Sequence, residues 1–318
     1  MATFSFLGVK DVHITHKTPR SRKDSYYDAI FNKLSFVQSL CDKYKADGLL
    51  DAGDLLDKKN PADTPHNVVR RTIELVKGFS CPWYGIYGNH EMPLLNMKDA
   101  RERHPKSVLF ESGVINHVPE EGIVLVKDGV QVRIVGADYD HYENDREVPW
   151  FARVRRDKSD DFVICLAHCF AGPTGGILQG GERRWSYKEI ARAGAADVYF
   201  FGHEHIDQGI VEVDGKFFVN NGSLSRGVLN EDNVARDVNV PLIEIDKSGV
   251  TVKLLRVECP PSDEIYSFAE ASVLPGESET INFIEKLIAS KPIDLELLID
   301  EAPHSKTAKK AVKGYLSL

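Results

Sequence analysis

The stretch FGHEH, residues 201–205, places two histidines one residue apart, directly after the hydrophobic run AADVYF and a glycine. The run predicts a buried β-strand, so both imidazoles are expected where that strand ends. In open α/β sheets, ligand sites gather at the carboxyl ends of strands. A single His-x-His pair is often a chance occurrence, so its meaning depends on whether other strands end in the same way.

Other hydrophobic runs do end in polar residues. The segments in question are FSFLGVKDVH, DGLLDAGD, PWYGIYGNH and DFVICLAH, and their terminal side chains are Asp11, His13, Asp54, Asn89, His90 and His168. Amphipathic helical patterns at 24–44 and around 65–77 alternate with these runs, which predicts a layered α/β core with helices outside a sheet. Strand pairs follow, including GIVLVKDGVQVRIVGA with a hairpin turn at its Asp-Gly. The polar ends, spread over almost 200 residues, can therefore converge at one edge.

The ligand types suit one kind of site. Carboxylate, amide and imidazole groups without thiolates favour divalent ions such as Mn²⁺, Fe²⁺ or Zn²⁺ over a sulfur-rich structural zinc site. The set is too large for one ion. Two ions about 3.5–4 Å apart, sharing a carboxylate, would use it, and such a pair suits in-line attack on phosphorus.

Taken in order, the blocks D-V-H, G-D-L-L-D, G-N-H-E, a lone histidine after a strand and G-H-E-H resemble the signature blocks of the calcineurin-like metallophosphoesterases, over roughly residues 4–256. The resemblance implies an α/β fold, a four-layer αββα sandwich, here with a short C-terminal helical appendage. It assigns the first metal to Asp11, His13, Asp54 and His205. It assigns the second to Asp54, Asn89, His168 and His203, with Asp54 as the bridge. Two divalent ions are implied, Mn²⁺ foremost, with Fe, Zn and Mg as alternatives.

Within that family, the chain resembles the SbcD-type DNA nuclease subunits of bacteria and phages. The resemblance rests on the basic segment and long helix after D-V-H, and on GDLLDKKNP. It implies a DNA repair exonuclease or endonuclease that uses metal-activated water, with DNA as substrate and an SbcC-like ATPase or a second copy as partner. Asp57 stands where some relatives have histidine, and the cap after the catalytic domain is shortened to about sixty residues.

Further residues are candidates for the reaction. His90, beside a metal ligand, is expected to protonate the leaving oxygen or stabilise the phosphoryl charge. Glu91 and Asp57 are expected to contact the metal ligands rather than the metals, and to orient those ligands or close turns. The basic run HKTPRSRK supplies Lys17, Arg20 and Arg22 as phosphate contacts, against the alternative of a solvated loop. Arg226 in NNGSLSRG is a fourth such contact or a turn-stabilising residue. The glycine-rich stretch 171–181 is expected to be a loop at the cleft, and His141 in DYDHYE is expected to line it.

The composition limits the possible core size, binding partners and cellular compartment. The chain has 318 residues, 42% of them hydrophobic, enough for one large core. A net charge of −8 argues against broad adhesion to nucleic acid but leaves room for a local basic groove. Five scattered cysteines indicate a reducing compartment, with Cys165 and Cys169 as small buried strand residues. With no signal peptide and no apolar run of membrane-spanning length, a cytoplasmic protein without membrane contact is expected.

The prolines of CPPSDE mark a boundary between a catalytic domain at residues 1–258 and a cap or partner-docking tail at 259–318. Helical spacing predicts short helices there, one with Ile281, Ile284 and Ile288 on one face. Three functions fit the sequence: a DNA nuclease, which we favour, a nucleotide or small-molecule phosphodiesterase, and a catalytically idle scaffold that binds a partner. The complete ligand set argues against the scaffold.

Overall fold

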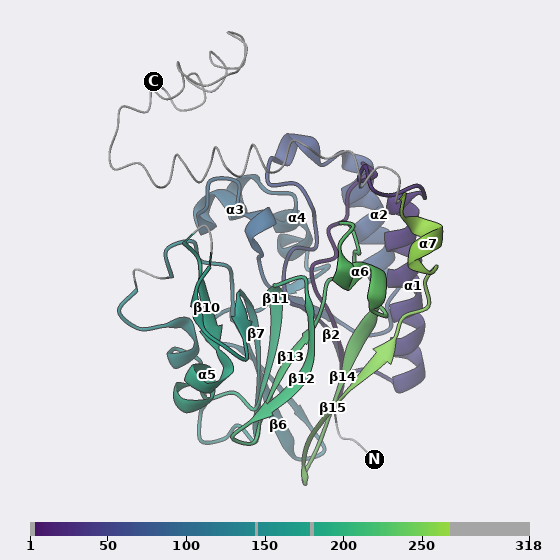
Figure 1. Cartoon of the computed structure of the whole chain (residues 1–318). Helices are drawn as coiled ribbons and strands as arrows, with labels where there is room; N and C mark the ends of the chain where they lie inside the picture. Colours follow the sequence, from purple (N-terminus) through teal and green to yellow (C-terminus); the bar gives the residue numbers. More distant parts are fainter. Residues whose placement is uncertain (1–3, 144–145, 179–180, 268–318) are drawn as a thin grey trace, which may run out of the picture. The chain divides into compact units, whose positions relative to one another are not determined.

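The computed structural model describes residues 4–143, 146–178 and 181–267, and Figure 1 shows its elements in chain order. One sheet has the order β15-β14-β1-β2-β3-β4. In chain order its strands are β1 (Phe4–Val9), β2 (Gly48–Asp51), β3 (Trp83–Gly85), β4 (Asn116–His117), β14 (Asn239–Asp246) and β15 (Gly249–Arg256). Strands β1 to β4 are parallel, whereas β14 runs antiparallel to β1. The carboxyl ends of β1, β2 and β3 therefore meet at one edge.

A second sheet has the order β12-β13-β11-β7-β6-β5. Its strands are β5 (Ile123–Lys127), β6 (Val130–Ala137), β7 (Phe162–Cys169), β11 (Val198–His203), β12 (Asp207–Val213) and β13 (Lys216–Asn221). Strands β6, β7, β11 and β13 are parallel. The β5–β6 hairpin turns at Asp128 and Gly129, which both have positive φ (52° and 74°), as a two-residue type I′ turn requires. The hairpin predicted from the Asp-Gly pair is confirmed.

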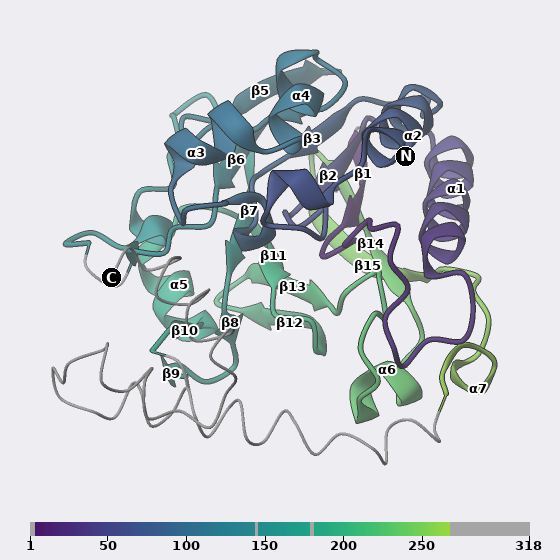
Figure 2. The same cartoon turned by 90° about the horizontal axis from the view of Figure 1, so that it is seen from above.

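The two sheets pack against each other, and helices cover their outer faces. Apolar side chains of both sheets form a common core, including Phe6, Leu50, Ile164 and Phe200, all fully buried. Helices α1 (Tyr26–Tyr44) and α2 (His66–Lys77) cover the first sheet, and α5 (Tyr187–Ala193) lies on the far side of the second (Figure 2). The four-layer αββα sandwich implied by the sequence is confirmed.

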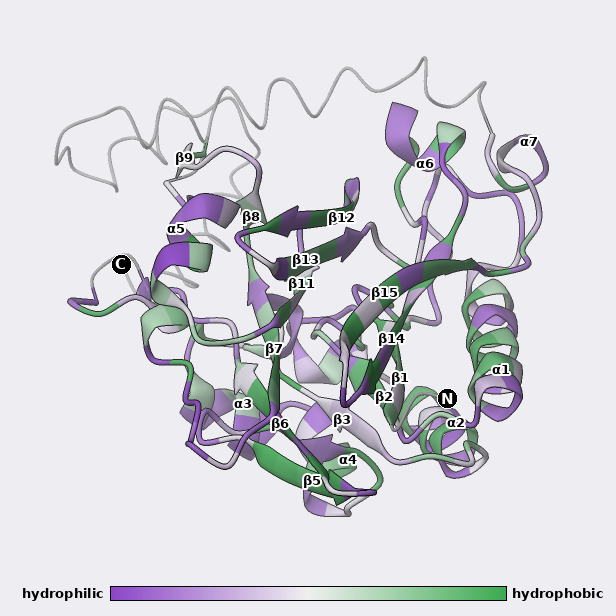
Figure 3. Ribbon diagram, turned by 90° about the horizontal axis from the view of Figure 1, so that it is seen from below, coloured by the Kyte–Doolittle hydropathy of each residue, from purple (hydrophilic) through white to green (hydrophobic). Residues whose placement is uncertain are grey.

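Helix α1 illustrates how the sequence sets a boundary and a buried face. Ser25 caps it by accepting a hydrogen bond from the Asp28 N–H, and Lys45 ends it in the left-handed conformation at φ 50°. Ile30, Leu34 and Val37 are fully buried at helical spacing, and Figure 3 shows green and purple alternating around the helix. Each such side chain contributes about 1.5–3 kcal/mol by leaving water.

The sequence patterns did not predict several short elements. They are α3 (Met97–Arg103), α4 (Lys106–Glu111), α6 (Glu231–Ala235), α7 (Ser262–Ile265), β4, α5 and a small sheet of β8 (Ala171–Gly172), β10 (Arg183–Ser186) and β9 (Gly176–Ile177). The glycine-rich stretch expected to be a loop thus contributes two short strands.

The beginning of the expected C-terminal tail packs on the sandwich. Ile265 and Tyr266 are buried, and the Tyr266 hydroxyl donates to the Arg226 carbonyl oxygen (2.7 Å). The predicted helices beyond it lie outside the described residues. Across 4–143, 146–178 and 181–267, none of the helices has the length and apolar character that a membrane span requires.

Candidate metal centre

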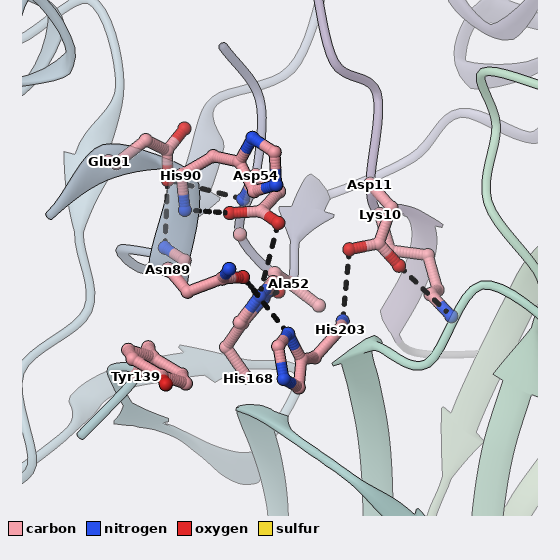
Figure 4. A network of polar contacts seen from close by, with 12 residues as sticks. Lys10, Asp11, Ala52, Asp54, Asn89, His90, Glu91, Tyr139, His168 and His203 are labelled. Atoms are coloured by element: carbon pink, nitrogen blue, oxygen red, sulfur yellow. Dashed lines mark hydrogen bonds and ion pairs between the residues drawn. The ribbon is translucent and has the colours of Figure 1, made fainter. Parts of the chain in front are cut away.

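The polar residues predicted from the strand ends do converge in the structure. They lie just beyond β1, β2 and β3 of one sheet and at the ends of β7 and β11 of the other (Figure 4). Four of them, Asp11, His13, Asp54 and His203, have positive φ angles of 46°, 50°, 55° and 84°. A left-handed backbone costs a non-glycine residue of order 1–3 kcal/mol, and such residues cluster at functional sites. Backbone strain at this edge of the sheets therefore accompanies the orientation of these four side chains toward the site.

One group of potential ligands comprises Asp11, His13, Asp54 and His205, each with a ligand atom within 4.8 Å of the others. The Nε2 atoms of His13 and His205 face each other at 3.0 Å. Two neutral imidazoles in this arrangement direct lone pairs at one another unless a proton or a cation lies between them. Zinc–nitrogen bonds are about 2.0–2.1 Å, so one ion can bind both nitrogens at this separation.

A second group comprises Asp54, His168 and His203, again with ligand atoms within 4.8 Å of one another. The Asn89 side-chain oxygen lies 3.0 Å from Nε2 of His168 and 2.9 Å from Nδ1 of His203. Figure 4 shows these four side chains pointing toward one another. The group therefore offers one amide oxygen, one carboxylate and two imidazoles to a shared point.

Asp54 is common to both groups. Its Oδ2 lies 3.4 Å from Nε2 of His168 and 3.8 Å from Nε2 of His13. Its Oδ1 accepts a hydrogen bond from the His90 N–H (2.8 Å). A Cβ at Gly88 would collide with Oδ1 of Asp54, so only glycine fits beside this carboxylate.

Charges at the centre suit a divalent cation. Burial favours the neutral form of Asp54, but His168 and His13 outweigh it and hold the pKa of Asp54 well below its ordinary value. Burial also disfavours protonated His168, yet Asp54 raises its pKa to about 9. Burial lowers the pKa of His205 to about 4, although Asp11 opposes the shift. At neutral pH without metal the centre thus holds carboxylates, a neutral His205 and a protonated His168. Binding of an ion would displace the His168 proton, and the resulting donors fit Mn²⁺, Fe²⁺ or Zn²⁺.

A buried glutamate fixes the loops that carry Asp54 and Asn89. Glu91 accepts hydrogen bonds from the N–H groups of Asp54 (3.1 Å), Leu56 (3.1 Å) and Gly88 (2.8 Å). Its Oε2 also accepts from the Lys106 ammonium (2.9 Å), which pairs with Asp51 at 3.1 Å as well. All three charged side chains are fully buried. The orienting role predicted for Glu91 agrees with these contacts.

Two lysines of the centre carry no signal in the sequence. Lys106 lies 15 residues beyond Glu91, at the start of α4. Lys10 precedes Asp11, and its buried ammonium donates to the Glu204 carbonyl (2.6 Å) and the Asn220 side chain (2.6 Å). It also lies 3.2 Å from Oδ2 of Asp11. Lysines usually read as surface residues, so only the folded structure reveals these two as fixed counter-charges.

His90 lies beside the first group. Its ring packs edge-on against His13, with 4.6 Å between ring centroids. Nδ1 lies 2.6 Å from the Asp57 carbonyl oxygen, and because that oxygen can only accept, Nδ1 carries the proton. Asp57 also reaches Nδ1 of His13 at 3.4 Å. His90 is 34% exposed, so a substrate at the centre can contact it.

The four basic residues predicted to contact phosphate divide into two pairs. Lys17 and Arg20 are exposed, a few residues beyond His13. Arg22 is buried and donates to Asp24 and to the Arg226 carbonyl oxygen (2.8 Å). Arg226 is buried too, and donates twice to the Asn233 carbonyl (2.9 and 2.7 Å). Arg22, which pairs with the Asp24 carboxylate, and Arg226 thus act as structural donors, in agreement with the alternative given for Arg226. The phosphate contact expected of Lys17 and Arg20 stays a prediction.

A hollow opens beside His168 and His203. It is lined by Tyr139, Asp140, His141, Phe170, Glu182 and Arg183, among others. His141 thus lies at the hollow, where its segment was predicted to line a cleft. Glu182 follows the glycine-rich stretch without any motif, so no sequence pattern indicated its place here.

The potential ligands lie within a segment that matches a known protein family. A family model described as calcineurin-like phosphoesterase matches residues 6–207, more than half of the chain and a range that includes every potential ligand named above. No curated protein matches the sequence.

Solved structures share the fold at low sequence identity. The NAD nucleotidase of Haemophilus influenzae is 16% identical with a TM-score of 0.50, and the match covers 99% of this chain and 60% of that one, so this chain spans less than two-thirds of the nucleotidase. GAP50, the anchor in the inner membrane complex of Plasmodium, is 10% identical with a TM-score of 0.51, covering 81% and 86%. A dimetal phosphatase from Danio rerio is 10% identical with a TM-score of 0.50, covering 81% and 100%. At these identities the likeness shows the fold alone.

Proposed function

Because this chain belongs to the calcineurin-like phosphoesterase family, we propose that it is a metal-dependent phosphodiester hydrolase and that its substrate is DNA. One observation carries the proposal: the Asp54 carboxylate lies within 4 Å of an imidazole from each of the two ligand groups. A single buried carboxylate between two sets of donors is the arrangement that a pair of divalent ions requires. We accordingly assign Asp11, His13, Asp54 and His205 to one ion, and Asp54, Asn89, His168 and His203 to the other.

Different residues would have different roles in the proposed reaction. When bound, the ions would supply Lewis acidity, which activates water and stabilises negative charge on the phosphate oxygens. Asp11 and Asp54 would provide the negative charge that retains the ions. Glu91 and Lys106 hold the loops that present Asp54 and Asn89. As an imidazolium, His90 can donate its Nε2 proton to the leaving oxygen while Nδ1 stays bound to the Asp57 carbonyl.

Replacing His90 with alanine is expected to lower kcat by about 10²-fold, because positioned proton donors contribute at least that much. Mn²⁺ affinity should stay unchanged, because His90 is assigned to neither ion. Turnover of bis-p-nitrophenyl phosphate and calorimetric Mn²⁺ binding measure the two quantities. His66→Ala, at the exposed start of α2, is the matched control. Loss of Mn²⁺ binding in His90→Ala would contradict the assignment.

Lys17 and Arg20 support DNA as the substrate. Both are exposed and lie a few residues beyond His13, so a phosphate backbone that crosses the centre on that side would meet them. Replacing both with glutamate is expected to weaken DNA binding and to reduce the slope of log K against log salt by about 1 for each phosphate interaction that the substitutions remove. Hydrolysis of the small ester should be unaffected.

Fluorescence anisotropy with labelled duplex across a salt series measures that slope. Lys158→Glu/Lys247→Glu is the matched control, since both lysines are exposed and lie where β7 begins and where β14 ends, away from the centre. If the control pair weakens DNA binding as much as the Lys17/Arg20 pair, the interaction is non-specific.

A nucleotide phosphodiesterase is the second candidate, and the hollow beside His203 favours it. Asp138, Asp140, Glu143 and Glu182 line that hollow, and their charge would repel a long polyanion such as DNA more strongly than a single nucleotide. The shared fold of the Haemophilus influenzae NAD nucleotidase is compatible with such a substrate.

One experiment separates the candidates: Mn²⁺-dependent cleavage of labelled single- and double-stranded DNA, NAD and bis-p-nitrophenyl phosphate by the same preparation. Cleavage of DNA that disappears in Asp54→Asn supports the nuclease. Cleavage of NAD with DNA left intact supports the nucleotide enzyme. Sizing the protein in solution with and without duplex tests the further proposal of a second copy or an ATPase partner.

A further inference from the structure

We propose that Glu182 is a positioning residue that fixes the orientation of His203 and thereby sets the affinity of the second ion. The proposal rests on the proposed function, because it assumes that Asp54, Asn89, His168 and His203 hold an ion.

The two ring nitrogens of His203 face different neighbours. Nδ1 lies 2.9 Å from the Asn89 side-chain oxygen, on the side where the other ligand atoms converge. Nε2 lies 3.2 Å from Oε2 of Glu182. The Phe170 ring packs on the imidazole with 4.1 Å between centroids. Phe170, Asn89 and Glu182 therefore define the orientation of the ring.

The chemistry of imidazole makes the Glu182 contact specific. A ring whose Nδ1 binds a cation keeps its proton on Nε2, so Nε2 becomes a donor. The Glu182 carboxylate is an acceptor placed to receive that proton in a hydrogen bond. A carboxylate in this position fixes both the tautomer and the ring angle and makes the metal-binding nitrogen more basic.

Glu182 is itself held in place from two directions. Its Oε1 accepts a hydrogen bond from the Tyr139 hydroxyl (2.5 Å). Its backbone carbonyl accepts from the Leu178 N–H (2.8 Å). These two hydrogen bonds hold Glu182 beside His203, with Oε2 facing the His203 ring.

His168 shows the same scheme with a different partner. Nδ1 of His168 lies 2.8 Å from the Ala52 carbonyl oxygen, while its Nε2 faces Asn89. Nδ1 of His13 has no hydrogen-bond partner among the described residues, and Oδ1 of Asp57 lies near it at the ion-pair distance of 3.4 Å, while its Nε2 faces His205. Glu182 provides for His203 the acceptor that the Ala52 carbonyl provides for His168.

Calorimetric titration of the full chain with Mn²⁺ tests the proposal. We expect two binding events in the wild type, and in Glu182→Gln one event weakened about 10–100-fold with the other unchanged. Glu182→Ala should weaken the same event at least as much. Tyr139→Phe removes the hydroxyl but keeps the Glu182–His203 contact, so a smaller loss is expected.

Glu189→Gln is the matched control, because Glu189 caps α5 through Ser186 and pairs with Arg183. Equal Mn²⁺ affinities in wild type and Glu182→Gln, with an unchanged metal-free melting temperature, would overturn the positioning role alone. Equal losses in Glu182→Gln and Glu189→Gln would also overturn it, because the effect would then be structural. A wild type that binds no Mn²⁺ would instead overturn the proposed function.

Discussion

Substitution of Asp54 by asparagine is expected to remove about 4 kcal/mol of transition-state stabilisation, or about 10³-fold in kcat/KM. The asparagine side chain would keep the volume of the carboxylate but lose the charge that lies between His13 and His168. One oxygen would become an amide donor, directed either at those imidazoles or at the His90 N–H, and both ions would lose their shared ligand.

The fold should survive the change, because the substitution is isosteric and removes a buried charge. The measurement is the rate of bis-p-nitrophenyl phosphate hydrolysis under saturating Mn²⁺, together with the melting temperature without metal. Asp47→Asn is the matched control, since Asp47 binds the Ser5 N–H and Lys127 where β2 begins, away from the site. Activity of Asp54→Asn within tenfold of wild type would refute the bridging role.

Replacing Lys106 with methionine is expected to lower the free energy of unfolding by about 3–5 kcal/mol, because it leaves the carboxylates of Asp51 and Glu91 buried without their counter-charge. Lys106 also donates to the Ile86 carbonyl (2.6 Å), so a backbone acceptor loses its partner too. An exposed lysine such as Lys77, at the end of α2, should change stability by less than about 0.5 kcal/mol when it is replaced by methionine.

The loss in free energy of unfolding caused by Lys106→Met should depend on pH. Burial raises the pKa of Asp51 to about 6, although Lys106 opposes the shift, and loss of Lys106 should raise that pKa further. A carboxyl whose pKa is higher in the folded state than in the unfolded state loses stabilisation as pH rises. Urea unfolding should therefore show a larger deficit at pH 8 than at pH 5, and Lys106→Met/Asp51→Asn should recover part of it. A deficit that is the same at both pH values would contradict this account.

The sequence predicted the large elements and the edge where the site lies, since hydrophobic runs ending in polar residues identify strand ends. Asp11, Asp54, Asn89 and His203 each follow such a run, and the structure brings them together. The small sheet around β9 and the helix α4 escaped prediction, because stretches of two to seven residues are too short to show a period.

Sequence patterns could not predict residues whose role depends on contacts made only in the folded structure. Lys10 and Glu182 contact ligand residues and Lys106 contacts Glu91, yet none of the three belongs to a recognisable block. Arg22 and Arg226 read as phosphate-binding residues because charged side chains usually lie exposed. In the structure both are buried, since the Asp24 carboxylate and the carbonyl oxygens of Arg226 and Asn233 accept their hydrogen bonds. Such pairings depend on contacts between residues distant in the chain, which no local pattern encodes.

The centre also joins the two sheets. The His203 N–H donates to Asp11 (2.9 Å) and the His168 imidazole contacts the Ala52 carbonyl, so each contact links residues of different sheets. A ligand that binds only the folded state at 100 times its dissociation constant adds about 2.7 kcal/mol to stability. An ion bound here would therefore hold the two sheets together and stabilise the fold. Chelation should accelerate proteolysis, and the steady-state amount of the protein in a cell should follow the supply of its metal.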